Sequence, residues 1–281
     1  MAFGLYSCIQ PICFAGRPLV RAGSPKTRPS LFPFTDTAPR AARPIVVLGL
    51  IAINSLIFLW MWDLPLRSQN AILVHYALMP ISYTNPAAAV RLGLDPANWW
   101  PLLTNTFLHG GWLHLISNMW FLWIFGPAME GRLGRFMFLV LYLGGGIAAS
   151  AVHVMTHVDS TEPVLGASGA IAAVIAAHAV TFPRERVVMV VLIIIIPLFF
   201  SVPTVVFALI WFGLQVIQGT SELASPGMAS AVAWWAHIGG FGFGALFAFA
   251  VGAFEFDSGV RTATWSGRGR HVPLIKPRTW L

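Results

Sequence analysis

The feature that most constrains this chain is a series of long apolar runs without a single charged residue. Three of these runs cover residues 136–151, 187–196 and 202–216. A helix that crosses a bilayer needs roughly 20 mostly apolar residues. Charged residues make up only 10% of the 281 positions, whereas soluble domains carry about 25%. We therefore expect an integral membrane protein.

The spacing of the apolar runs predicts an all-α membrane protein with six transmembrane helices in one domain. Residues 63–111 form a long connection punctuated by prolines, and residues 187–202, interrupted by Pro197, are expected to be a helical arm or re-entrant segment. The six spans are expected near residues 44–62, 112–126, 136–158, 164–182, 203–219 and 233–254.

Two basic tails flank the predicted helical domain. Residues 1–43, rich in Pro, Gly and Arg, are expected to be a disordered N-terminal tail. Residues 44–256 form the membrane domain, and residues 257–281 form a C-terminal tail. With the N-terminus inside, 15 of the 17 Lys and Arg residues lie in inner segments. Because inner loops are enriched in Lys and Arg, both termini are predicted to be cytoplasmic. This distribution also explains the net charge of +7 without nucleic-acid binding.

Several polar residues lie inside the predicted spans, where polar groups are costly and often functional. His114 and Asn118 are four residues apart in the second span and therefore share one helix face. Ser168 is expected about one turn into the fourth span, and His237 about one turn into the sixth. Since these three spans run in the same direction, the polar residues are predicted to lie at a similar depth.

This combination predicts nucleophilic catalysis. A serine hydroxyl becomes a useful nucleophile when an imidazole takes its proton. Ser168 would supply the hydroxyl and His237 the imidazole. The tetrahedral intermediate needs hydrogen-bond donors, and the donors on offer are His114, Asn118 and the backbone N–H of Ser168.

Glycines are placed to bring these groups together. Gly166 and Gly169 flank Ser168 and leave room for a substrate backbone or a neighbouring helix. Gly240 and Gly244 form a small-xxx-small pair, which predicts close packing of the sixth span on the fourth. Taken singly, a membrane serine or histidine is more often structural, but their joint placement favours catalysis.

Four segments carry a family resemblance: HGGWLHLISNM at 109–119, GPAMEGRLG at 126–134, GASG at 166–169 and AHIGGFGFG at 236–244. In order, spacing and topology they resemble the rhomboid family of intramembrane serine proteases. The resemblance implies that Ser168 is the nucleophile, His237 the general base, and His114 and Asn118 the oxyanion hole.

The resemblance also implies roles around the active site. Glu130 and Arg132 would brace the inner end of the second span. The connection 63–111 would lie in the outer leaflet, and the fifth span with the loop after it would form the substrate gate. His109 is interpreted as a structural loop histidine.

Two positions depart from the family pattern. Pro101 follows Trp100 where many members have arginine, and Ala172 stands where some have an aromatic residue beneath the histidine. Trp234 or Phe241 is expected to brace His237 instead. The base is expected to be oriented by packing and neutral hydrogen bonds in a Ser–His dyad, because only two carboxylates are placed to reach it, those of Asp159 and Glu162.

The expected activity is endoproteolysis of transmembrane protein substrates near the outer membrane surface. No cofactor or metal is expected, since Cys8 and Cys13 make no metal-binding spacing with any histidine. Two alternatives remain: a catalytically silent rhomboid-like protein that binds membrane clients, and a small transporter. A bacterial inner membrane is the expected location, and the sequence leaves the oligomeric state open.

Overall fold

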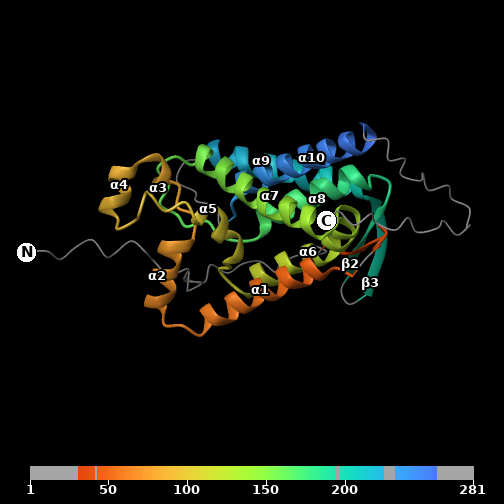
Figure 1. Cartoon of the computed structure of the whole chain (residues 1–281). Helices are drawn as coiled ribbons and strands as arrows, with labels where there is room; N and C mark the ends of the chain where they lie inside the picture. The colour runs from red at the N-terminus through yellow and green to blue at the C-terminus, as the bar shows by residue number, and fades with distance from the viewer. Residues whose placement is uncertain (1–30, 42, 194–195, 225–231, 258–281) are drawn as a thin grey trace, which may run out of the picture.

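A bundle of long helices carries two smaller parts at opposite ends (Figure 1). The structure, a computed structural model, describes residues 31–41, 43–193, 196–224 and 232–257. Short helices gather at one end of the bundle, which we call the loop end, and a three-stranded sheet lies at the other, which we call the sheet end. The predicted tail residues 1–30 and 258–281 lie outside the described residues.

Each of the six segments predicted to span the membrane contains a helix in the described part of the chain. By length and apolarity, α1, α7, α9 and α10 can each cross a membrane, as expected of an integral membrane protein. Helix α6 carries Glu130 and Arg132 near its end, and α8 is apolar but only 14 residues long. The bounds are α1 Ile45–Trp62, α6 Trp112–Leu133, α7 Arg135–Thr156, α8 Ser168–Thr181, α9 Thr204–Ala224 and α10 Trp234–Asp257.

The loop end is built by the connection between α1 and α6. Prolines in this connection begin short helices, because proline is favoured at the first helical position. Pro86 and Pro101 are the first residues of two of them, α4 and α5. The elements are α2 Leu66–Tyr76, α3 Ile81–Thr84, α4 Pro86–Arg91, α5 Pro101–Thr104 and the 3₁₀ helix η1 Asn105–Phe107.

Helix α8 lies at the centre of the bundle. It is apolar all round and rich in alanine, and most of its residues are buried, as expected for a helix enclosed by others. Helix α10 packs most extensively on α8 and α7. A Cβ atom at Gly240 would collide with the backbone of Gly169, and one at Gly244 with the backbone of Ala173. The small-xxx-small spacing thus brings the backbones of α10 and α8 into direct contact.

Residues 186–193 and 196–203 form two antiparallel strands, so the helical arm expected there is wrong. The strands are β2 Arg186–Ile193 and β3 Ile196–Pro203. The stretch is rich in valine and isoleucine, whose branched Cβ atoms favour strands over helices. The all-α expectation therefore fails at the sheet end.

The last part of the predicted disordered tail is also ordered. Strand β1, Leu31–Asp36, pairs antiparallel with β2. Two side-chain contacts hold it to the bundle: Trp120 Nε1 donates to the carbonyl oxygen of Pro33 at 2.7 Å, and Asp36 reaches His178. The composition of this segment predicts disorder because its partner strand lies more than 150 positions further along the chain, as Asp36 with Val187, and such pairing leaves no local pattern.

Glu130 joins the start of α1 to α6. Its carboxylate oxygens accept hydrogen bonds from the backbone N–H groups of Val46 at 3.0 Å and Val47 at 2.9 Å. The first N–H groups of a helix have no partner within that helix, so a side chain from α6 caps α1. Arg132 lies in the last turn of α6.

Candidate active site

Ser168 and His237 are in hydrogen-bond contact. Three helices, α6, α8 and α10, begin at the loop end and carry His114, Ser168 and His237 in their first turns. The distance from Ser168 Oγ to His237 Nε2 is 2.7 Å. His237 is buried, and Ser168 remains partly accessible. The contact satisfies the geometric requirement for a nucleophile beside its base.

Ser168 is the first residue of α8, not one turn into it as expected. The preceding chain is held extended, because Val164 pairs with Leu78 in a β-bridge. Gly166 then takes φ +125°, a conformation open chiefly to glycine. As the first helical residue, Ser168 has a backbone N–H that no earlier helical turn accepts, and it lies at the positive end of the helix dipole.

His114 and Asn118 lie beside the segment that leads into Ser168. A Cβ atom placed on Gly166 would be 2.5 Å from His114 Nε2 and 3.8 Å from Asn118 Nδ2. The Asn118 amide donates to the carbonyl oxygen of His114 at 3.0 Å. Because an amide nitrogen carries two hydrogens, one N–H of Asn118 is left over. The helix start thus brings His114, Asn118 and the N–H of Ser168 into one region.

Tryptophans from two helices contact the imidazole of His237. The Trp211 ring lies 5.7 Å from it, centroid to centroid, and the Trp234 ring lies 6.2 Å from it at 88°. Trp234 was one of the two expected bracing residues; Phe241, the other, contacts Trp211 and Phe212. Aromatic packing from α9 and α10 therefore surrounds the imidazole of His237.

Gln215 on α9 contacts the far nitrogen of the imidazole. Its Oε1 lies 2.8 Å from His237 Nδ1, and its side chain is buried. Gln215 was not among the residues predicted to form the site. The signal was present, because a glutamine inside an otherwise apolar span meets the same criterion that selected Ser168 and His237.

Neither carboxylate considered in the sequence analysis contacts the imidazole in the described structure. Asp159 is exposed and is tied to the hydroxyl of Thr84, which accepts from its backbone N–H at 3.1 Å. Glu162 is also exposed.

Asn105 ties the loop end to the active-site segment. Its Nδ2 donates to Ser150 Oγ on α7 at 2.9 Å, and its carbonyl oxygen accepts from the N–H of Gly166 at 2.9 Å. Asn105 was also not among the predicted site residues. Pro101 opens α5, and Asn105 anchors the loop end in this chain.

His109 is buried beside His114, with ring centroids 5.1 Å apart. Burial, and secondarily the neighbouring His114, lowers the pKa of His109 to about 3. Neither ring nitrogen has a hydrogen-bond partner in the described structure. The residue is therefore neutral at physiological pH and packs against His114, in keeping with the structural interpretation.

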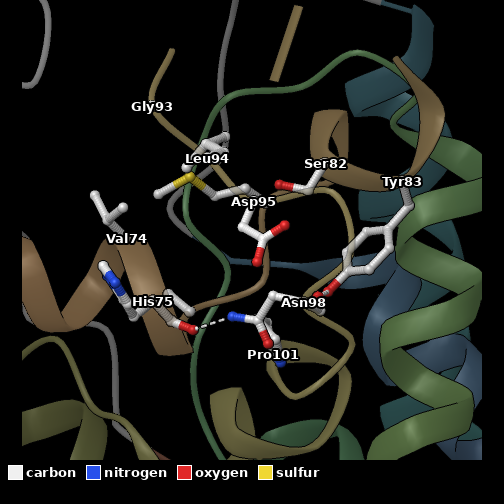
Figure 2. A pocket seen from close by; sticks show the side chains of 11 residues that line it. Val74, His75, Ser82, Tyr83, Gly93, Leu94, Asp95, Asn98 and Pro101 are labelled. Carbon is white, nitrogen blue, oxygen red and sulfur yellow. Dashed lines mark hydrogen bonds between the residues drawn. The ribbon is translucent and has the colours of Figure 1, made fainter. Parts of the chain in front are cut away.

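A small cavity lies entirely within the loop end (Figure 2). It is a cavity of about 50 Å³ whose polar lining includes Ser82, Tyr83, Asp95 and Asn98, and the Asn98 amide donates to the carbonyl oxygen of His75. Burial raises the pKa of Tyr83 to about 12. None of the residues around Ser168 lines this cavity, so it is separate from the candidate active site.

Comparison with known proteins identifies relatives. The presenilin-associated rhomboid-like protein of rat mitochondria is 32% identical over 155 residues, which are 54% of this chain and 36% of that protein. The putative rhomboid protease YdcA of Bacillus subtilis is 37% identical over 95 residues, 32% of this chain and 45% of YdcA. Rhomboid protease GluP of the same organism is 39% identical over 94 residues, 31% of this chain and 18% of GluP.

The matched part covers the candidate active site. The chain spans about a third of the length of the mitochondrial relatives. A family model described as the rhomboid domain matches residues 96–254, more than half of the chain and all three helices that carry His114, Ser168 and His237. The chain belongs to the rhomboid family.

Proposed function

We propose that this protein is an intramembrane serine endopeptidase that cleaves transmembrane segments with a Ser168–His237 dyad. The observation that carries the proposal is the 2.7 Å contact between Ser168 Oγ and His237 Nε2. Two matched relatives from Bacillus subtilis are named as rhomboid proteases, one of them putative. A silent client-binding protein would have no need to keep nucleophile and base in contact.

The reaction follows from this contact. Ser168 Oγ attacks the scissile carbonyl carbon while its proton passes to His237 Nε2. When the tetrahedral intermediate collapses, the C–N bond breaks and His237 gives the proton to the leaving amine. Water then attacks the acyl-serine ester with His237 again as base, which releases the carboxylate product and restores the hydroxyl.

The oxyanion would form next to the start of α8. The backbone N–H of Ser168, the remaining N–H of Asn118 and the side chain of His114 are the proposed donors. Removing one oxyanion donor typically costs about 2.7–4 kcal/mol in turnover. The unpaired N–H groups and the dipole at the start of α8 add fixed positive charge at the same place.

The proposed substrates are membrane proteins cut close to the membrane surface. Ser168 begins α8 at the loop end of the bundle. The scissile peptide bond of a substrate must therefore lie at the loop end during cleavage. We propose six spans, with the sheet end and both termini in the cytoplasm, and α9 as the gate between lipid and dyad. The loop after α9, residues 225–231, lies outside the described residues. The preponderance of Lys and Arg in the predicted inner segments supports this orientation.

The compartment is a separate proposal. A bacterial inner membrane agrees with the two Bacillus subtilis relatives. A mitochondrial membrane is the second candidate, because two relatives that match over 155 residues are named as mitochondrial. Fractionation of the source cells with an antibody to the chain distinguishes the two.

The test is labelling of the purified full chain by a fluorophosphonate probe, which reacts covalently with activated serine. We expect labelling of the wild type and none of Ser168→Ala or His237→Ala, both still folded. Because nucleophile and base act as a unit, the double variant should be no worse than either single one. A wild type that stays unlabelled, or a Ser168→Ala variant labelled at the wild-type rate, would overturn the proposal and favour the client-binding alternative.

A further inference from the structure

We infer that Gln215 is the positioning residue for the base His237, and that its place on α9 makes the dyad depend on the docking of that helix. The inference rests on the proposed function, because it assigns a role to a side chain that acts only through the base.

The orientation of the Gln215 amide follows from its two contacts. Its Nε2 donates to the backbone carbonyl oxygen of Trp211 at 3.1 Å. An amide nitrogen is a donor and an amide oxygen only an acceptor, so the oxygen is the atom that faces His237 Nδ1 at 2.8 Å. The backbone of α9 itself therefore fixes which end of the amide meets the imidazole.

This orientation selects one form of the neutral imidazole. Because Gln215 Oε1 can only accept, His237 Nδ1 must carry the hydrogen. Nε2 is then unprotonated and accepts the hydrogen bond from Ser168 Oγ at 2.7 Å. The opposite tautomer would direct an N–H at the serine and could not take its proton.

Burial makes this selection strong. Gln215 is 6% exposed and His237 is 8% exposed, so water does not readily replace either partner. Without the amide oxygen, the Nδ1–H would be buried without an acceptor. A carboxylate would also accept this hydrogen, but a charge buried among apolar helices is costly. Gln215 orients the base without adding a charge.

Gln215 stands on a helix that carries neither member of the dyad. Helix α9 meets α10 through Trp235 Nε1, which donates to the carbonyl oxygen of Gly219 at 3.2 Å. Hydrogen bonds weaken steeply when donor and acceptor separate. An outward movement of α9 by a few ångströms would therefore remove the orienting acceptor, and the dyad would regain its active form only when α9 docks again.

The test compares Gln215→Met, Gln215→Glu and the control Gln218→Met. Met has nearly the shape of Gln but no acceptor oxygen, and Gln218 is exposed on the same helix. The readout is the second-order rate of fluorophosphonate labelling of the full chain, measured from about pH 5 to 9, the range in which an imidazole changes charge.

We expect Gln215→Met to be labelled roughly 10- to 100-fold more slowly, the effect of one lost buried hydrogen bond. Gln215→Glu should regain most of the rate at high pH, with its loss on acidification moved to higher pH, because a carboxylate favours the imidazolium. Gln218→Met should match the wild type.

Two outcomes separate this inference from the proposed function. If the wild type is labelled and Gln215→Met follows its rate and pH profile, the positioning role is wrong while the dyad stands. If the wild type itself is not labelled, both fail. Should Gln215→Met not fold, Gln215→Glu decides alone, since an unchanged pH profile in that variant rejects contact with the base.

Discussion

Asp36 Oδ2 accepts a hydrogen bond from His178 Nε2 at 2.8 Å, and both side chains are fully buried at the sheet end. The pair joins the segment before the first long helix to the end of α8, the helix that begins with Ser168. Arg40 also pairs with Asp36, at 3.2 Å. The buried pair therefore makes residues 31–41 part of the folded domain.

Replacing Asp36 by Ala is expected to destabilise the protein by about 3 kcal/mol. This value lies between the cost of a buried donor left without a partner and that of a broken buried ion pair. The measurement is thermal unfolding in detergent, with Glu162→Ala, an exposed acidic residue, as the matched control. Equal stability of the two variants would mean that the pair does not hold β1 in place.

Glu130→Ala is expected to destabilise the protein by about 1–2 kcal/mol, because the first N–H groups of α1 lose their cap. Glu130→Gln keeps one acceptor oxygen and should fall between Ala and wild type. Denaturation in detergent measures both. If Gln is as harmful as Ala, the charge of Glu130 rather than its two hydrogen bonds to Val46 and Val47 is what matters.

His109 is expected to give the protein a pH-dependent stability. Its pKa in the folded state is lowered to about 3, so between that value and about 6.5 the unfolded chain binds the extra proton. The free energy of unfolding therefore falls as pH drops through this range, by up to about 1.4 kcal/mol per pH unit for this group.

The His109→Phe variant removes this contribution. Its free energy of unfolding should depend less steeply on pH than that of the wild type between about pH 4 and 6. Parallel curves for the two proteins would show that His109 is not buried in its neutral form.

The helical bundle could be predicted from the sequence because apolar period and length are local signals. One rule predicts four of the site residues: a polar residue inside a membrane span is a candidate for a functional role. These residues are His114, Asn118, Ser168 and His237. Gln215 meets the same rule, but an amide neither attacks nor takes a proton, so its orienting role is visible only from its contact with His237.

The sheet end could not be predicted in the same way. The apolar period of residues 187–202 does not distinguish a buried helix from a strand, and the preference of valine and isoleucine for strands was outweighed by the length of the apolar run. The pairing of β1 with β2 depends on contacts far apart in sequence, such as Asp36 with His178. The start of α8 was misplaced for a related reason: the turn at Gly166 and the bridge between Leu78 and Val164 are tertiary features.

A contact at the end of α9 is expected to restrain that helix. His157 Nε2 lies 3.5 Å from Glu222 Oε2, which links the end of α7 to the last turn of α9. Glu222→Ala should therefore raise amide hydrogen exchange in residues 216–224, with Glu162→Ala as the control. Unchanged hydrogen exchange in residues 216–224 would mean that the contact between His157 and Glu222 does not restrain α9.

The final prediction concerns the two carboxylates that precede α8. In a serine triad, replacing the orienting aspartate by asparagine lowers turnover about 10⁴-fold. Here the atom at His237 Nδ1 is the amide oxygen of Gln215, while Asp159 and Glu162 are exposed. We therefore expect Asp159→Asn and Glu162→Gln to keep most of the fluorophosphonate labelling rate, and most cleavage of a detergent-solubilised transmembrane substrate. A loss near 10⁴-fold in either folded variant would mean that a carboxylate orients the base during catalysis, and that the dyad with a neutral partner is wrong.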